Sequence, residues 1–333
     1  MNHERPSAEP GKRWGVILAG GDGTRLQRLT HLICGDDRPK QFCPLVGSET
    51  LLEQTRKRAE RSILQEQILV PLAKNHRAFY LQEAGIRPSQ RIIQPSNKGT
   101  AVPILYSLLS IEQNDKDAIV AMLPCDHYYS DEAGFTTALE SAFDSAARRP
   151  DSVVLLGASP QGPEVEYGWI ELGESAGARL NEVRRFCEKP TVHVARELIE
   201  RGSLWNTFVM VGHVRGFLEM VNGAPGSSVR EAVEELRTSP LWAGAEVHIP
   251  DSLYERLRPV DFSREVLSLQ ASRLAALRLA GTGWSDLGQP ERVVAVLRET
   301  GVEPWWMREW QVPRRPAGRS SAVAARAANP AIA

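Results

Sequence analysis

The chain has 333 residues, of which 42% are hydrophobic and 24% are charged. Its 40 Lys plus Arg and 41 Asp plus Glu leave a formal net charge of -1, which excludes the strongly basic surface of a general nucleic-acid binder. No apolar run approaches the roughly 20 residues needed to cross a bilayer, so we expect no membrane-embedded segment. The four cysteines form no C-x-x-C pair, a pattern typical of reduced thiols in a cytoplasmic protein.

The first half of the chain alternates between short strands and helices. Residues 1–12 are polar and interrupted by proline, which predicts a flexible tail. Buried strands are expected at the apolar runs 14–18, 68–70, 91–94, 118–123 and 153–157. Between them, apolar residues at helical spacing predict helices over 101–111 and 135–148. This alternation predicts an α/β fold built from βαβ units around a mostly parallel sheet.

The second half has a looser pattern. Short apolar segments alternate with glycine-rich turns, which predicts added antiparallel strands at 167–172, 180–187 and 208–211. Residues 221–228 are expected to form a surface loop. From Pro313 onward there are arginines but no acidic residue, which predicts disorder. We therefore expect a main domain over 13–290 and a short C-terminal extension over 291–333.

The most informative stretch runs from Leu18 to Leu26 (LAGGDGTRL), directly after the first strand. Its glycines let the backbone turn sharply, and successive N–H groups in such a turn bind anions. Arg25 adds a planar cation suited to phosphate oxygens. The loop has neither the Lys of a P-loop nor the third glycine of a dinucleotide fingerprint. The glycines alone fit an ordinary strand-to-helix turn, but Arg25 and the downstream 39–42 (PKQF) favour phosphate binding.

These two motifs resemble the sugar-1-phosphate nucleotidyltransferases, and PKQF favours the mannose-1-phosphate guanylyltransferase branch. Further segments similar to family motifs follow in the family's order: 123–127 (LPCDH), 167–170 (YGWI), 186–190 (FCEKP), 204–206 (LWN) and 283–288 (GWSDLG). The resemblance covers roughly residues 14 to 290. It implies a Rossmann-like, glycosyltransferase-A-like fold whose ligands lie at the carboxyl ends of the strands.

The resemblance also implies a reaction, in which a nucleotidyl group passes from a nucleoside triphosphate to a sugar-1-phosphate and pyrophosphate is released. A phosphate monoester has a second pKa near ~6 and is largely ionised at pH 7, so the enzyme needs no general base. It needs positioning and charge neutralisation, which suit Arg25 and Lys40 as catalytic cations. Mg²⁺ is the expected cofactor, held by Asp126 and Asp286. Either aspartate also fits a turn or helix cap, and for Asp286 taken alone that is the more common role.

The remaining site residues are carried over from the family motifs. Those expected to bind the nucleotide are Leu18, Gly20, Gly21, Gly23, Thr24, Pro95, Gly99 and Thr100. Those expected to bind the sugar phosphate are Gly168, Glu188, Lys189 and Asn206. Several positions depart from the guanylyltransferase pattern: Gly99 replaces an Asn, and Phe208 replaces a glycine. The first departure bears on the choice of base and the second on the shape of the sugar pocket. The family's SIDY is matched only loosely by 259–262 (PVDF), so Asp261 is given no firm role.

The expected reaction is therefore GTP plus mannose-1-phosphate to GDP-mannose. The same reaction with another hexose-1-phosphate or another nucleotide is the nearest alternative. An inactive paralogue that binds nucleotide sugars and regulates a partner is an alternative of another class. The aromatic cluster of Trp305, Trp306 and Trp310 favours packing onto the main domain over a contact between copies of the chain in a homo-oligomer.

Overall fold

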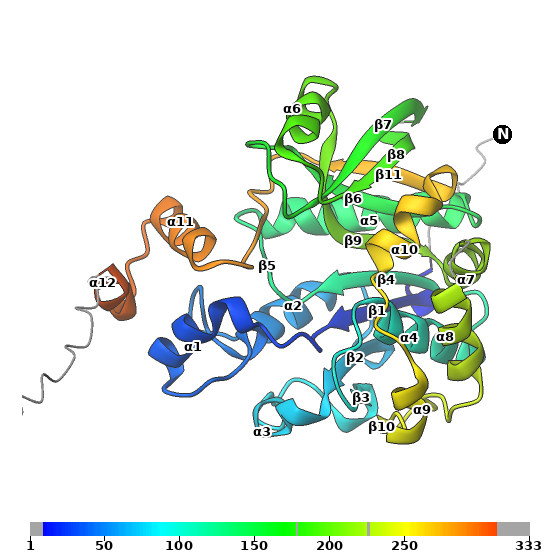
Figure 1. Cartoon of the computed structure of the whole chain (residues 1–333), viewed down its shortest axis with the longest axis horizontal. Coiled ribbons are helices and arrows are strands. Elements are labelled where there is room, and N and C mark those ends of the chain that lie inside the picture. Colours follow the sequence, from blue (N-terminus) through cyan, green and yellow to red (C-terminus); the bar gives the residue numbers. More distant parts are fainter. Residues whose placement is uncertain (1–8, 178, 225–226, 312–333) are drawn as a thin grey trace, which may run out of the picture.

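The computed structural model describes residues 9–177, 179–224 and 227–311. Within them a ten-stranded mixed sheet forms the centre of the molecule, in the order β10-β3-β2-β1-β4-β9-β6-β11-β8-β7 (Figure 1). The strands are β1 (Arg13–Leu18), β2 (Ile68–Ala73), β3 (Arg91–Gln94), β4 (Ile119–Pro124), β6 (Val153–Ala158), β7 (Gly168–Gly177), β8 (Leu180–Glu188), β9 (Leu204–His213), β10 (Val247–His248) and β11 (Leu274–Leu279).

The sheet has a parallel half and a mixed half, in which β6 and β11 pair in parallel. Strand β1 pairs in parallel with β2 and β4, and β2 pairs in parallel with β3. Strand β9 then runs antiparallel between β4 and β6, and β7 and β8 form an antiparallel pair beyond β11. The prediction of a Rossmann-like sheet with added antiparallel strands is therefore confirmed. The carboxyl ends of β1, β3 and β4 lie at one edge, as parallel pairing requires.

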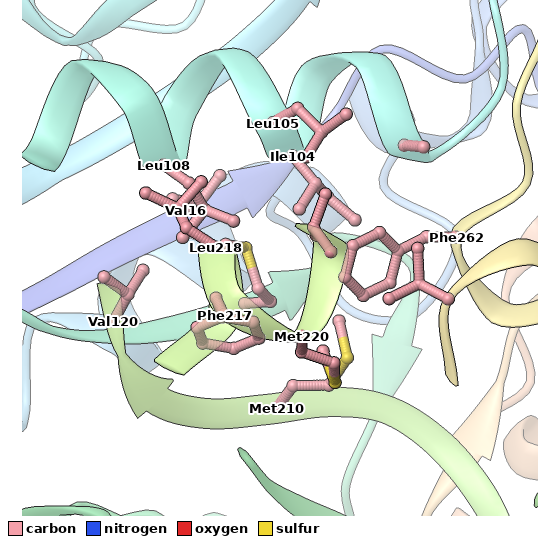
Figure 2. Packing of buried hydrophobic residues seen from close by; sticks show 14 of the residues in the cluster. Val16, Ile104, Leu105, Leu108, Val120, Met210, Phe217, Leu218, Met220 and Phe262 are labelled. Atoms are coloured by element: carbon pink, nitrogen blue, oxygen red, sulfur yellow. The ribbon is translucent and has the colours of Figure 1, made fainter. Parts of the chain in front are cut away.

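Helices cover both faces of the sheet because successive residues of a buried strand point to opposite sides. In β1, Val16 belongs to the core on one face and Ile17 to the core on the other. The first face is covered by α4 (Ala101–Asn114), α7 (Val214–Gly223) and α8 (Ser227–Arg237). Figure 2 shows α4 placing Ile104, Leu105 and Leu108 over Val16. The second face is covered by α2 (Leu51–Ala59) and α5 (Glu132–Arg148).

A third core lies to one side of the sheet, where α1 (Gln27–Cys34) meets α11 (Pro290–Thr300) and α12 (Trp305–Gln311) (Figure 1). Trp306 is buried there, and the Arg28 guanidinium lies over the Trp310 ring. Trp305 is exposed. The prediction that this aromatic cluster packs onto the main domain is confirmed for Trp306 and Trp310. The division of the chain at residue 290 stays a prediction.

The remaining elements are short. Their bounds are β5 (His127–Tyr128), β12 (Ser285–Asp286), α3 (Arg77–Tyr80), α6 (Val192–Glu200), α9 (Asp251–Arg256) and α10 (Phe262–Glu265). Single 3-10 turns are η1 (Pro10–Lys12), η2 (Thr24–Leu26), η3 (Lys40–Phe42), η4 (Gln65–Gln67), η5 (Lys74–His76), η6 (Pro88–Gln90), η7 (Leu267–Leu269) and η8 (Ala271–Arg273). None of the helices in the described ranges is both long and apolar enough to span a bilayer.

Two sequence-based boundaries need correction. The loop predicted at 221–228 is wrong, because α7 continues to Gly223, α8 begins at Ser227 and Ala224 is buried between them. Helix α5 begins at Glu132 instead of residue 135, because the Asp131 side chain accepts a hydrogen bond from the Gly134 N–H and caps the first turn. The predicted C-terminal tail and residues 1–8 of the predicted N-terminal tail lie outside the described residues.

Candidate active site

Two adjacent cavities open at the edge where β1, β3 and β4 end. The first, of about 400 Å³, lies against the glycine loop, and the second, of about 350 Å³, lies against the start of β7 and the end of β8. They meet at shared lining residues, namely Thr100, Asp126, His127, Phe208 and Asp261. The two cavities therefore adjoin each other, with Asp126 in the lining of both.

The predicted nucleotide-binding residues divide into two groups. Those that line the first cavity are Leu18, Gly20, Gly21, Gly99 and Thr100. Those outside its lining are Gly23, Thr24 and Pro95, of which Gly23 and Thr24 form the turn into η2. The loop after β1 is confirmed as a wall of the cavity, while the roles of its residues stay predictions.

Gly20 is the point of closest approach in this wall. A Cβ at Gly20 would lie 2.0 Å from the Gln94 Nε2 atom, so only glycine fits here without displacing that amide. Gln94 is itself fixed, because its Oε1 accepts a hydrogen bond from the Tyr254 hydroxyl at 2.9 Å. Gly20 therefore allows the glycine loop to pack directly against the end of β3.

The PKQF segment lies directly beneath the glycine loop. The buried Gln41 amide donates hydrogen bonds to the carbonyl oxygens of Ala19 and Gly21, both at 2.8 Å. These bonds fix η3 against the loop and direct the neighbouring Lys40 toward β4. Gln41 is thus the residue that joins the two motifs, although the motif match alone gave it no role.

Lys40 forms an ion pair with Asp126, and of the two only Asp126 belongs to the lining of the cavities. The Lys40 Nζ atom lies 2.5 Å from Oδ2 of Asp126. Burial by itself would raise the pKa of Asp126, but the Lys40 ammonium outweighs it and lowers that pKa to about 2. Burial would lower the pKa of Lys40, and Asp126 reverses that shift and raises it. Both groups are therefore charged at neutral pH.

A two-stranded ladder brings the two predicted metal ligands to the same place. Strands β5 and β12 pair antiparallel with Asp286 opposite His127, and the Leu287 N–H donates to the Asp126 carbonyl at 2.9 Å. Oδ1 of Asp286 accepts hydrogen bonds from the Tyr167 hydroxyl, at 2.7 Å, and from Arg292. Two aspartates far apart in sequence are thereby held in register.

The donor set at this junction fits magnesium better than zinc. In the described part of the chain, no group of three or more His, Cys, Asp or Glu side chains is arranged to hold a metal ion. Mg²⁺ needs only one or two protein carboxylates, because substrate phosphates and water complete its shell. Asp126 and Asp286 are the carboxylates that would hold such an ion.

Arg25, the other predicted catalytic cation, reaches across the cleft. Its Nη2 atom donates to Oε2 of Glu166 at 2.9 Å, and its side chain is 60% exposed. Glu166 lines the second cavity. An exposed pair of this kind contributes at most about 1 kcal/mol, so it holds Arg25 only weakly. Arg25 thus lies at the rim of the site rather than in its lining.

All four residues predicted to bind the sugar phosphate line the second cavity: Gly168, Glu188, Lys189 and Asn206. Glu188 is half-buried at the end of β8, opposite Gly168 on β7. Burial and the nearby Asp261 carboxylate raise the pKa of Glu188 to about 6. A carboxylate in this setting is a strong acceptor for hydroxyl groups once it is ionised.

Gly99 and Phe208, which depart from the guanylyltransferase pattern, both lie at the cleft. Gly99 has φ +83°, and a Cβ there would lie 2.4 Å from the Val260 carbonyl oxygen. The segment at 97–101 therefore packs backbone to backbone on the loop before α10, and the Asn97 side chain accepts from the Gly99 N–H. Phe208 has φ +60°, unusual for a residue with a side chain, and lines both cavities.

Several site residues could not be identified from motifs. Arg292 contacts Asp286 and also pairs with Glu164 at 2.8 Å, and its guanidinium lies over the Tyr167 ring. Asp261, to which the sequence gave no firm role, caps α10 and lines both cavities. A basic residue shortly after the WSDLG motif was the only available sign of Arg292.

Comparisons with known proteins agree with this geometry. The model of a family described as nucleotidyl transferase matches residues 14–301. A xanthan biosynthesis protein, XanB, of Xanthomonas campestris is 29% identical over 296 residues, which are 86% of this chain and 60% of that protein. A mannose-1-phosphate guanylyltransferase of Sinorhizobium fredii is 28% identical over 84% of this chain and 54% of its own length.

The chain thus spans a little over half the length of the curated relatives it matches. A solved structure from Thermus thermophilus, described as a "mannose-1-phosphate geranyltransferase", superposes with a TM-score of 0.72 at 28% identity. That match covers 88% of this chain and 80% of the other. The family model, the fold and the strand-end cleft together show that the chain belongs to the nucleotidyl transferase family.

Proposed function

We propose that this chain catalyses the reaction of GTP with mannose-1-phosphate, forming GDP-mannose and pyrophosphate. The observation that carries the proposal is the junction of two cavities at Asp126, the carboxylate that pairs with Lys40. The relatives support the substrate pair, because one bears the name mannose-1-phosphate guanylyltransferase. The four free cysteines support a reducing, cytoplasmic location.

In the proposed complex the nucleoside occupies the first cavity and the hexose the second. The glycine-loop amides and Arg25 hold the triphosphate, and Arg25 exchanges Glu166 for phosphate oxygens. Glu188 accepts hydrogen bonds from sugar hydroxyls, and the Asn206 amide donates to them or accepts from them. Lys189 pairs with the sugar phosphate. The α-phosphate then lies beside Asp126, in reach of the sugar phosphate oxygen that attacks it.

The chemistry needs charge neutralisation and alignment rather than proton transfer. Lys40, held in its charged form by Asp126, faces the negative charge that develops on the α-phosphate. Asp126 and Asp286 would hold Mg²⁺, which when bound neutralises phosphate charge and orients the triphosphate. Tyr167 and Arg292 keep Asp286 in position through their hydrogen bonds.

The test is pyrophosphate release with the four common nucleoside triphosphates, each paired with mannose-, glucose-, galactose- and N-acetylglucosamine-1-phosphate. A dominant signal with GTP and mannose-1-phosphate, abolished by chelation of Mg²⁺, is the expected result. A stronger signal with another pair would change the assigned substrates, while the assigned type of reaction would remain. No turnover with any pair, in a folded sample that still binds nucleotide, would favour an inactive regulatory paralogue.

Asp126→Asn tests the assignment of Asp126 separately. It keeps the shape of the side chain and removes the charge that Mg²⁺ and Lys40 require. We expect turnover to fall at least about a hundredfold with nucleotide binding retained. Asp131→Asn is the matched control, since it replaces the aspartate that caps α5, away from the lining of both cavities, with another good cap.

A further inference from the structure

Two cysteines lie in contact beside the segment that carries Lys40. The Sγ atoms of Cys34 and Cys43 are 3.3 Å apart. Cys34 is in the last turn of α1, and Cys43 directly follows η3. The intervening residues 35–42 form a short loop that contains Arg38 and Lys40. A covalent bond between the two sulfurs would therefore close a ring around the proposed catalytic lysine.

The two thiols differ in exposure. Cys34 is half-buried, whereas Cys43 is fully buried in the core formed with α1 and α11. Burial and the neighbouring Cys34 raise the pKa of Cys43, while the Arg38 guanidinium acts in the opposite direction. Cys34 is thus the sulfur that a small molecule can reach, and Cys43 is the sulfur already placed behind it.

We propose that Cys34 and Cys43 form a reversible dithiol–disulfide pair, oxidised by low-molecular-weight disulfides, that restrains the Lys40 loop. The Cys34 sulfur loses its proton and attacks one sulfur of the small disulfide, whose S–S bond breaks and releases a thiolate that takes this proton to become the first free thiol. The Cys43 sulfur then attacks the Cys34 sulfur of the mixed disulfide and releases the second thiol, which takes the Cys43 proton. Two protein thiols are oxidised, and one external disulfide is reduced to two thiols.

The bond would act on Lys40 through the backbone. A disulfide requires a separation of about 2 Å, so the two sulfurs must approach each other by roughly 1 Å. The Cys43 N–H donates to the Lys40 carbonyl at 3.0 Å, and Arg38 donates to the Phe42 carbonyl at 3.3 Å. A displacement of Cys43 is thereby transmitted to the loop that places Lys40 on Asp126. A displacement of about 1 Å of a catalytic group from its aligned position lowers turnover strongly.

The experiment maps the thiols of the full chain after equilibration in oxidised and reduced glutathione at graded ratios, followed by alkylation and peptide mass analysis. We expect a Cys34–Cys43 disulfide peptide at oxidising ratios, lost again after reduction with dithiothreitol. The peptide should be absent from Cys34→Ser and retained in Cys187→Ser, which removes another half-buried thiol. A Cys34–glutathione adduct that never closes, or a pair that stays reduced at every ratio, would overturn the proposal.

Turnover is the second measurement, and it rests on the proposed function. We expect kcat of the oxidised chain and of oxidised Cys187→Ser to fall about tenfold and to return with dithiothreitol. Cys34→Ser should show no such dependence on the glutathione ratio. Equal kcat for the oxidised and reduced chain would overturn the restraint on Lys40. The thiol mapping does not depend on the substrates. An inactive reduced chain would therefore count against the proposed function, while the mass analysis would still decide whether the disulfide forms.

Discussion

Arg292 donates a hydrogen bond from Nη1 to Oδ1 of Asp286, so the helix that follows the WSDLG motif holds one of the proposed metal ligands. The same guanidinium donates to Glu164 at 2.8 Å. One cation therefore separates two carboxylates that would otherwise repel each other. Because α11 also packs on α1 in the third core, the position of Asp286 depends on residues beyond the WSDLG motif.

Arg292→Ala should lower both stability and activity. The loss of the cation removes the ion pairs of Asp286 and Glu164, which are largely buried, at a cost of about 2 kcal/mol in the free energy of unfolding. We expect kcat to fall and the Mg²⁺ concentration for half-maximal rate to change, with partial recovery in Arg292→Lys. Urea unfolding and Mg²⁺ titration of the rate are the measurements.

Arg298→Ala is the matched control for Arg292→Ala, because its side chain is exposed on the same helix. It should change the free energy of unfolding by less than about 0.5 kcal/mol. If Arg292→Ala altered stability but left the Mg²⁺ dependence of the rate unchanged, Arg292 would have a structural role only.

Gly99→Ala should be much more costly than Gly47→Ala. Both glycines have similar left-handed φ values, +83° and +85°, so both substitutions carry the same strain of about 1 kcal/mol. A Cβ at Gly47 meets no atom within 4 Å, whereas one at Gly99 lies 2.4 Å from the Val260 carbonyl oxygen. We expect Gly99→Ala to lose about 2 kcal/mol more in urea unfolding and to raise KM for the nucleotide. Equal losses for the two variants would refute the close packing on Val260.

How far the sequence predicts this site depends on the kind of contact. Leu18 ends one buried strand and Asp126 follows another, so parallel pairing alone placed them at one edge. Contacts such as Arg25 with Glu166 join positions 141 residues apart, and no spacing rule reveals them. The helix boundary at 223–227 was missed because Gly and Pro in that stretch are typical of loops. Local sequence patterns thus predict where the cleft lies, but they do not predict the contacts between residues far apart in the sequence that position its side chains.

Phe208→Gly should be more stable than Phe208→Ala by about 1 kcal/mol, because only glycine adopts φ +60° without strain. Both variants lose the ring that packs against the first core, so the comparison isolates the backbone. Removing the ring also enlarges the junction of the two cavities, so we expect a lower KM for N-acetylglucosamine-1-phosphate relative to mannose-1-phosphate. Thermal unfolding and the two KM values test both points. A KM ratio equal to that of the wild type would exclude Phe208 from sugar selection.

Glu188→Gln should stabilise the chain, and the gain should depend on pH. The pKa of Glu188 is raised from 4.5 to about 6 on folding, so between these values the folded state binds the proton more tightly than the unfolded state. The free energy of unfolding of the wild type therefore falls as pH rises through this window, by about 2 kcal/mol in total. Because glutamine does not titrate, the free energy of unfolding of the variant does not fall with pH for this reason.

Urea unfolding of wild type and Glu188→Gln below pH 4.5 and above pH 6 measures the difference. We expect the advantage of the variant to be small at the lower pH and to grow to about 2 kcal/mol at the higher. Glu174→Gln, at an exposed position on β7, should show no such growth. A constant difference across the window would mean that burial does not hold the Glu188 proton. Loss of sugar-phosphate binding in Glu188→Gln at the higher pH would show that the same carboxylate serves the substrate at the expense of stability.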